Sequence, residues 1–484
     1  MAILVPDVLL LIFTILMEID PTSLHSCILI NRSWCEVATP MFWKYATYTF
    51  YKNCFNYNEE SRKKLYNVIF HFLSHESIDL LSNNNITLPL NRLPNKPTFN
   101  YMNYFTHVSS IWIKDMAHRT INLDTVGRKK KVKLLKEEIF KLIFSNCKNV
   151  KIFCWNTKLE LYTYENSIPF FSNLNSLSID FQKPRTDYIF GRLSNICQNL
   201  KELEIEECNK DSEHLASLIE NQNDLQSLYV RFDDTEKKYD FLNYGIGKKM
   251  EMLKKLALQP LPQSPPKFLP KLQNLLELNL HNDYYGELND VMVNWEEWGT
   301  NLNLTSFPVL KCLKTSYLQC NIESFIVANS GREILEIEFR HSLESSTYQP
   351  DNRILIRKIS THCPKLTSLT MDLDLMNVSD LTILFSNCTQ LEKIYFTAKV
   401  MASPNGDNLL KVLSDSSLEN LKDFSFNDKW NFSLEGLENF FKSWRSKKKS
   451  PINFTHYYDE LFYYWTSDHE ELVKKYKTEG IIIG

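Results

Sequence analysis

Glycine is scarce in this sequence, with 11 residues among 484. Because a loop that cradles phosphate groups needs glycine for close backbone approach, this scarcity argues against the common nucleotide-binding loops. The run Gly245–Met250 comes nearest to such a motif, yet it completes no dinucleotide fingerprint. The sequence also has no Gly-x-Ser-x-Gly turn, which would place a serine nucleophile. We therefore expect no enzymatic activity and no cofactor.

Excess charge and paired cysteines are absent as well. The net charge of −3 at pH 7 argues against a general nucleic-acid binder. The 11 cysteines are an odd number, are dispersed along the chain and include no Cys-x-x-Cys pair. Such thiols are typical of a reduced protein in the cytoplasm, the nucleus or both, and their spacing predicts no metal site.

Long apolar runs are lacking too. The most apolar stretch, Val8–Met17, is shorter than the roughly 18 residues that a membrane-spanning helix needs. It has the length of a signal-peptide core, but no Lys or Arg precedes it, and Asp7 and Glu18 flank it. No small-x-small cleavage site follows. We therefore expect neither a secretory signal nor contact with a membrane.

The first 43 residues instead predict three short amphipathic helices. Asp20-Pro21 sets a turn, with proline in the first turn of the next helix, and Asn31 offers a cap before Trp34. Helices of this size bury little surface, and a unit well below about 60 residues is marginally stable alone. The segment is therefore expected to keep an apolar face for a partner.

The same segment resembles an F-box. Val5-Pro6 stands where that family has Leu-Pro, Asp20-Pro21 and Leu24 match its middle turn, and Trp43 matches its closing Trp. Ile30–Trp34 is similar to the family's Val-Ser/Asn-Lys/Arg-x-Trp. The resemblance implies docking on a Skp-family adaptor of a cullin ligase core. Some of the implied contacts must instead hold the helices together; the set is Val5, Pro6, Leu9, Ile12, Leu16, Leu24, Ile30 and Trp34.

A second pattern, apolar-x-x-apolar-x-apolar, returns from about residue 108 onward. Its spacing of mostly about 22 to 32 residues is close to the leucine-rich repeat period of roughly 20–29. The last two apolar positions alternate with polar ones, which predicts a strand with one buried face, and helix-like stretches such as 211–219 follow. Because one unit cannot bury its apolar side alone, neighbours must stack. Examples are Val108-Ile111-Ile113, Leu225-Leu228-Val230 and Leu366-Leu369-Met371.

These patterns predict an α/β fold. A three-helix F-box would precede a curved leucine-rich-repeat solenoid, with parallel strands on the concave face and helices on the convex face. The predicted domains are an F-box at 1–45, a helical and loop linker at 46–105, the solenoid at 106–450 and a C-terminal capping segment at 451–484.

Four cysteines recur three residues before the first apolar position of a strand, namely Cys147, Cys197, Cys363 and Cys388. This placement resembles the cysteine-containing type of leucine-rich repeat that often accompanies an F-box. A small, weakly polar side chain also suits a tight, buried corner between a helix and a strand. We therefore interpret these thiols as structural.

Three other motifs have an ordinary and a functional interpretation. The proline-rich run 258–266 is predicted to be an insertion between repeats, with a ligand for a proline-recognition domain as the alternative. The basic run Arg128–Lys133 is predicted to be a solvated face, with a nuclear import signal or an anion contact as the alternative. His71 and His75 lie four apart, but a zinc site needs a third ligand.

The strand positions between the buried ones are predicted to face the concave surface and to bind a protein substrate. Tyr, Trp and Arg are the residue types that most often anchor protein interfaces. The candidate residues are Trp112, Glu202, Glu204, Tyr229, Arg231, Glu338, Arg340 and Tyr395.

Together, the resemblance and the repeats imply a substrate-receptor subunit of an SCF ubiquitin ligase. Such a subunit accelerates ubiquitin transfer by proximity and orientation, with no bond chemistry of its own. The alternative is a non-catalytic leucine-rich-repeat scaffold in which the F-box-like segment is only an N-terminal cap. An enzyme is the third hypothesis, for which the sequence assembles no active-site signature.

Overall fold

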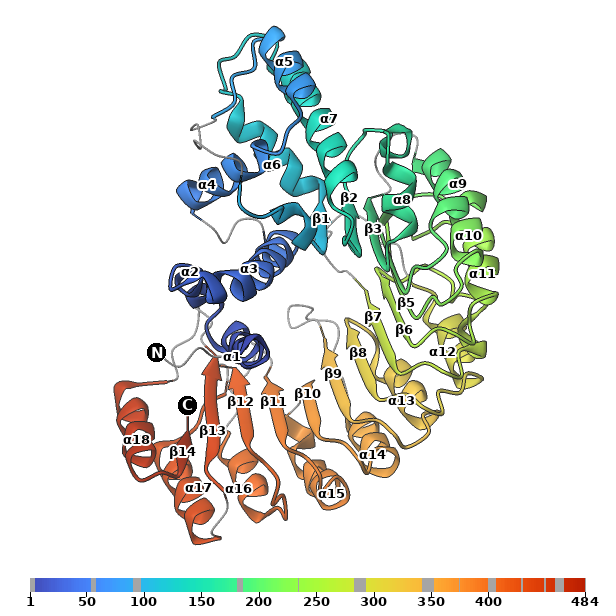
Figure 1. Cartoon of the computed structure of the whole chain (residues 1–484). Coiled ribbons are helices and arrows are strands. Elements are labelled where there is room, and N and C mark those ends of the chain that lie inside the picture. Colours follow the sequence, from blue (N-terminus) through green and yellow to red (C-terminus); the bar gives the residue numbers. More distant parts are fainter. Residues whose placement is uncertain are drawn as a thin grey trace. The chain divides into compact units, whose positions relative to one another are not determined.

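The structure is a computed structural model that describes residues 5–53, 58–89, 97–180, 186–233, 235–282, 293–341, 352–373, 375–398, 406–427, 430–447, 450–457 and 465–483. It is an α/β protein whose strands all run parallel and follow the order of the chain (Figure 1). The chain divides into a first compact unit, Met1–Cys208 with Ser212–Leu225, and a second, Asn209–Asp211 with Gln226–Gly484. Within the described ranges, no helix combines the length and apolar character that crossing a membrane requires.

The first unit begins with helices and continues into alternating strands and helices. Its helices are α1 (Pro6–Ile19), η1 (Pro21–Ser23), α2 (Leu24–Ile28), α3 (Arg32–Asn53), α4 (Glu59–Phe70), α5 (His75–Asn83), η2 (Tyr101–Tyr104), α6 (Ser110–Thr120), α7 (Arg128–Asn146), η3 (Leu161–Thr163), α8 (Ser167–Ser172), α9 (Thr186–Ile196) and α10 (Glu213–Glu220). Its strands are β1 (His107–Ser109), β2 (Ile152–Trp155), β3 (Ser176–Asp180) and β4 (Glu202–Cys208), and they pair in this order.

The second unit repeats one strand and one helical segment. Its strands are β5 (Ser227–Phe232), β6 (Lys255–Gln259), β7 (Glu277–His281), β8 (Cys312–Ser316), β9 (Glu336–Arg340), β10 (Ser368–Asp372), β11 (Lys393–Thr397), β12 (Asp423–Asn427), β13 (Ile452–Tyr457) and β14 (Ile482–Ile483). Its helices are α11 (Asp240–Gly247), η4 (Leu269–Lys271), α12 (Trp295–Asn303), α13 (Cys320–Ala328), α14 (Arg353–His362), η5 (Leu375–Asp380), α15 (Leu381–Asn387), α16 (Asp407–Asp415), α17 (Leu434–Ser446) and α18 (Ser467–Thr478).

Rows of apolar side chains hold the second unit together. The register places Leu313 opposite Leu278 on one side and Ile337 on the other, and all three are fully buried. The same row continues through Leu369 and Ile394. The helical segments cover this face of the strands (Figure 1). The predicted alternation of buried and exposed strand positions is thus confirmed for the second unit.

The four repeat cysteines lie where the spacing predicts, at buried corners before strands. The Cys388 thiol donates to the carbonyl oxygen of Cys363 at 3.3 Å, one repeat away, and the Cys197 thiol donates to that of Phe171. Burial raises the pKa of both Cys197 and Cys388 to about 12. Because the thiolate is the reactive form, Cys197 and Cys388 are inert packing groups with one weak hydrogen bond each.

The N-terminal helices close around a small apolar core. α1 starts at Pro6, where a missing N–H costs no hydrogen bond, and α3 starts after Asn31, whose side chain accepts from the Trp34 amide at 3.0 Å. The buried core residues are Leu9, Phe13, Leu24, Cys27 and Ala38. These three helices lie where the apolar spacing predicts, although α3 continues well past residue 45.

α3 joins the N-terminal helices to the first strand. Its Trp43 is buried and stacks on Tyr101 and on Phe105, with ring centroids 5.0 and 5.8 Å apart. One helical turn and a half further on, Tyr48 meets the ring of His107 in β1 edge to face. The N-terminal helices therefore pack onto the strand-bearing part of their unit through two groups of ring contacts.

Residues 46–105, for which the sequence predicts helices and loops, contain α4, α5 and η2. α4 is fastened to α6 by the carboxylate of Asp115, which accepts from the Tyr66 hydroxyl at 2.6 Å and from Arg119 at 2.8 Å. Arg62 donates to the same carboxylate at 3.4 Å. The Arg62 and Asp115 side chains are only 9% and 15% exposed, so this is a largely desolvated polar cluster.

We expect the substitution Asp115→Ala to lower the free energy of unfolding of the first unit by about 3 kcal/mol, because it leaves the largely buried Arg62 guanidinium without this carboxylate. Chemical denaturation followed by tryptophan fluorescence measures the change. The matched control is Asp124→Ala, an exposed carboxylate of the same unit, for which we expect less than about 0.5 kcal/mol. Equal stability of the two variants would contradict this role of Asp115.

One strand prediction in the first unit is wrong. The sequence places Trp112 on a strand with Ile111 and Ile113 on either side, whereas β1 already ends at Ser109. The Ser109 side chain accepts from the amide of Ile111 at 3.2 Å and caps α6. Trp112 therefore lies on a helix and is 1% exposed, so it belongs to the core and not to a binding surface.

Two of the remaining motifs also have a defined structure. The proline-rich run 258–266 begins with the last two residues of β6 and continues into the connection to β7, where the Pro262 carbonyl accepts from the Trp298 indole at 3.1 Å. The prediction of an insertion is wrong, because β6 starts at Lys255 and β7 already starts at Glu277, so the run is the ordinary connection between two strands of the second unit. The basic run Arg128–Lys133 forms the first turns of α7, and Lys131 donates to the carbonyl oxygen of Asn85.

Candidate interaction surfaces

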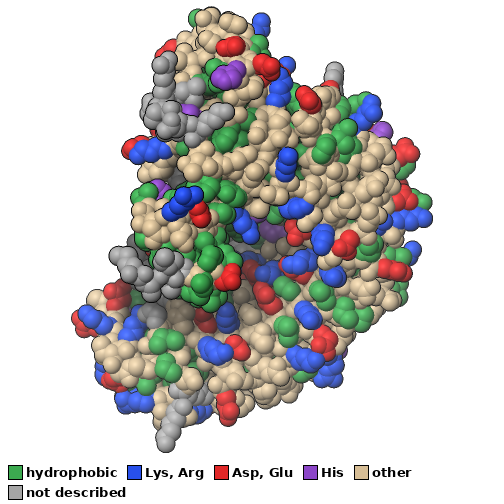
Figure 2. Space-filling view, viewed as in Figure 1, with side chains coloured by type: hydrophobic (Ala, Val, Ile, Leu, Met, Phe, Trp, Pro, Cys, Tyr) green, Lys and Arg blue, Asp and Glu red, His purple; other side chains and the backbone are tan. Residues whose placement is uncertain are grey.

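Exposed apolar side chains gather on α1 and on the turn that precedes α3. Ile12, Ile15 and Ile19 are 39%, 50% and 78% exposed, and Val8 lies in line with them. Their spacing of three and four residues places them on one face of the helix. We call Val8, Ile12, Ile15 and Ile19 the α1 stripe. Hydrophobic side chains are concentrated in this region of the surface (Figure 2).

The α1 stripe lies beside the face of α1 that the helix uses for its own packing. Leu9 and Phe13 are fully buried, and the ring of Phe13 meets Trp34 edge to face at 5.3 Å. Leu16 is partly buried against the same core. α1 is therefore apolar on more of its circumference than its own unit needs, which is typical of a helix with a further partner.

The eight predicted adaptor contacts divide into two groups in the structure. Val5, Pro6, Ile12 and Ile30 are exposed. Leu9 and Leu24 are fully buried, and Leu16 and Trp34 are partly buried against them. Sequence reasoning missed Ile19 and Leu29, both more than 70% exposed, because apolar spacing alone does not tell which face of a helix is covered.

The strand face of the second unit carries most of the other predicted residues. Tyr229 and Arg231 lie on β5, Glu338 and Arg340 on β9, and Tyr395 on β11, and each alternates with buried neighbours. The register places Tyr229, Glu338 and Tyr395 in one row across the strands. In the first unit, Glu202 and Glu204 alternate in the same manner with buried positions of β4.

Charges of opposite sign pair along this strand face. Lys314 lies 2.9 Å from the Glu336 carboxylate and 3.6 Å from that of Glu338, which in turn accepts from Arg340 at 2.7 Å. The hydrogen bond to Glu336 and the two negative charges raise the pKa of Lys314. Tyr229 donates to the Gln259 side chain at 3.2 Å. The face is thus polar, with paired charges and spaced aromatic rings, which suits a protein partner better than an apolar ligand.

The basic run borders a pocket in the first unit. Lys133 lines it together with Lys114, Lys136 and Lys158. Burial, and then repulsion by Lys114, lowers the pKa of Lys136, whose ammonium donates to Thr157 at 3.2 Å. The lining also includes Glu137 and Glu160, so the excess of positive charge is small.

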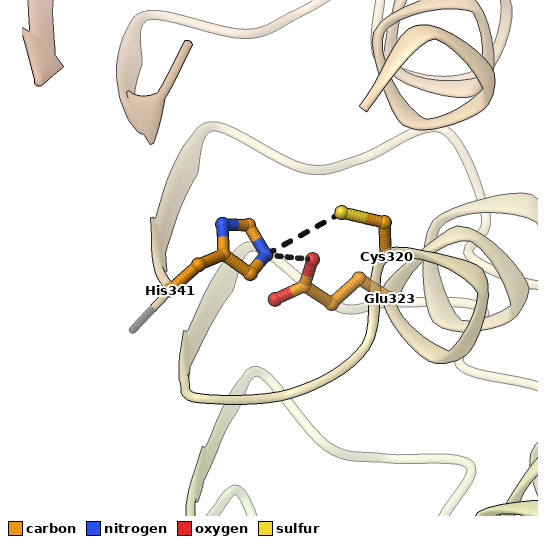
Figure 3. A group of neighbouring side chains, drawn as sticks. All are labelled: Cys320, Glu323 and His341. Atoms are coloured by element: carbon orange, nitrogen blue, oxygen red, sulfur yellow. Dashed lines mark hydrogen bonds and ion pairs between the residues drawn. The ribbon is translucent and has the colours of Figure 1, made fainter. Parts of the chain in front are cut away.

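A third cluster lies inside the second unit and combines three types of metal-ligating side chain. Cys320 and Glu323 lie one turn apart on α13, and His341 follows β9 directly (Figure 3). The His341 Nε2 lies 2.8 Å from the Glu323 carboxylate and 3.6 Å from the Cys320 sulfur. Burial opposes a charged imidazole, but the negative charge of Glu323 and the nearby Asp372 carboxylate outweigh it and raise the pKa of His341 well above its ordinary value.

The sequence was compared with models of protein families and with curated proteins, and neither comparison finds a match.

Proposed function

We propose that this protein is the substrate-receptor subunit of an SCF-type ubiquitin ligase, built from an F-box and a solenoid of cysteine-containing leucine-rich repeats. The F-box docks on a Skp-family adaptor of the cullin core, and the strand face of the repeats binds a protein substrate. The protein itself performs no bond chemistry, and it acts in the cytoplasm, the nucleus or both.

The α1 stripe is the observation that carries this proposal. A four-residue apolar face next to a packed core is costly to leave in water, since its side chains are 39–78% exposed and complete burial of one such side chain is worth about 1.5–3 kcal/mol. It lies in the part of the chain whose order of residues, from Val5-Pro6 to Trp43, resembles an F-box. A helical partner that covers this stripe would account for both findings.

The strand-bearing part supports the second half of the proposal. Its repeat of strand, corner cysteine and helix is what a cysteine-containing leucine-rich array requires, and such arrays present extended binding surfaces. The two tyrosines in one row, Tyr229 and Tyr395, are residues of the type that anchors protein interfaces.

We expect the double substitution Tyr229→Ala/Tyr395→Ala to remove at least one protein that co-purifies with the full chain from cells, while the adaptor is retained. Both residues lie on the half-exposed strand face, so the fold is expected to persist. The control is Tyr244→Ala, an exposed tyrosine on α11 of the same unit. The measurement is quantitative mass spectrometry with the ligase inactivated. An unchanged set of partners would exclude these tyrosines as the substrate anchor.

The alternative is a scaffold in which the N-terminal helices merely cap the repeats. One observation favours it: Trp43 and Tyr48 of α3 pack against Tyr101, Phe105 and His107, as a cap would. A cap explains α3, but it gives the α1 stripe no function. The two hypotheses differ in one result, because a cap leaves the folded wild-type chain without affinity for the adaptor.

A further inference from the structure

The Cys320, Glu323 and His341 cluster converges on one point in space. The candidate ligand atoms, which are the sulfur, one carboxylate oxygen and one ring nitrogen, all lie within 4.8 Å of one another. The three side chains come from only two places, the first turn of α13 and the end of β9, and point toward each other (Figure 3). All three residues are buried, so any group that they bind is held out of bulk water.

Further side chains orient the cluster from outside. Asp372 of β10 approaches the other ring nitrogen of His341, Nδ1, at 3.6 Å and also accepts from the backbone amide of His341. Thr315 of β8 donates to the Glu323 oxygen that faces away from the imidazole. In metal sites, such outer contacts fix the orientation of the ligating side chains. Here Asp372 would orient His341, and the Thr315 hydroxyl would orient Glu323.

The charges of the cluster favour a cation. Glu323 and Asp372 bring two largely buried carboxylates to one imidazole, and the Cys320 thiolate would add a third negative charge beside them. The burial of such groups costs free energy unless they are paired. A thiol, an imidazole and a carboxylate in one set select a borderline-soft transition metal, because calcium and magnesium prefer oxygen ligands alone.

We propose that Cys320, Glu323 and His341 bind one Zn²⁺ ion through Sγ, a carboxylate oxygen and Nε2, with a water molecule in the fourth position. The zinc replaces the proton of the Cys320 thiol and any proton at Nε2, while Nδ1–H faces Asp372. The ion links α13 to the end of β9 in the next repeat. This is a structural role that is independent of the adaptor and of the substrate.

The test uses the full-length chain, first stripped of metal with a chelator and then titrated with Zn²⁺ or Co²⁺. We expect one equivalent of bound zinc by elemental analysis and, with cobalt, a thiolate-to-metal absorption band. Zinc at about 100 times its dissociation constant is expected to raise the midpoint of thermal unfolding by several degrees. Magnesium at the same concentration is expected to have no such effect.

Two variants separate the site from adventitious binding. Cys320→Ser is expected to abolish the cobalt band, and Asp372→Asn to weaken zinc binding roughly tenfold. The matched control, Cys312→Ser on neighbouring β8, is expected to keep both signals. If the wild-type chain binds no zinc, or if Cys320→Ser retains the band, the proposal is wrong and the cluster is a buried ion pair.

Discussion

The substitution Ile12→Asp is expected to weaken binding of the Skp-family adaptor more than about 100-fold, with the fold left intact. Ile12 is 39% exposed in the centre of the α1 stripe, so a carboxylate there meets water in the free protein. In the complex, it would be buried in an apolar interface without a partner, in addition to the loss of the apolar contact. Titration calorimetry of the purified chain with the adaptor measures the change.

The choice of position decides whether this experiment is informative. Leu9 is also implied by the F-box resemblance, but it is fully buried, so Leu9→Asp would disrupt the core of the N-terminal helices and lose binding for a trivial reason. The matched control is Ile168→Asp, which places the same charge on an exposed isoleucine of α8. Circular dichroism and the unfolding midpoint should agree among the three proteins. Wild-type affinity of Ile12→Asp would overturn adaptor docking through the stripe.

The substitution Gly331→Ala is expected to lower the free energy of unfolding of the second unit by more than about 4 kcal/mol. An effect of this size is expected because the added methyl group would overlap with backbone atoms. A Cβ atom at Gly331 would lie 1.8 Å from the carbonyl oxygen of Pro308. That contact is with backbone, which cannot rotate away as a side chain can. The Gly331 amide also donates to the carbonyl oxygen of Phe307 at 3.1 Å, which holds the two segments together.

A second glycine provides the control. Gly247, at the end of α11 in the same unit, has no atom within 4 Å of the position of an added Cβ. Gly247→Ala is therefore expected to change stability by no more than about 1 kcal/mol, in the direction of stabilisation. Urea unfolding of both variants compares them directly. If Gly331→Ala unfolds at the wild-type urea concentration, the close approach of Pro308 and Gly331 is incorrect.

Much of the repeat architecture is encoded in local spacing and was predictable. A strand with one buried face needs apolar residues two apart, and Leu228 and Val230 of β5 show this pattern and this burial. The corner cysteines, such as Cys388, were predictable for the same reason, since each recurs at a fixed offset from its strand. Features that recur once in each repeat can therefore be predicted from residue spacing alone.

Positions set by capping or by contact between repeats were harder to predict. The triplet at 108–113 fits a strand and a helix equally well, and only the Ser109 side chain, which caps α6, decides between them. Cys320 and His341 lie 21 positions apart, and they meet because adjacent repeats stack. No spacing rule for a metal site covers such a pair, so the sequence alone predicts none.

The continuity of α3 bears on the mechanics of any complex. This helix has 22 residues and is therefore about 33 Å long. Its Trp43 stacks on the rings of Tyr101 and Phe105, so the helix is held near its middle as well as at β1. A partner bound to α1 would be linked to β1 through packed elements, because α1 packs on α3 and α3 packs on β1. The orientation of β1 relative to that partner would then depend on side-chain packing along α3 and not on a flexible linker.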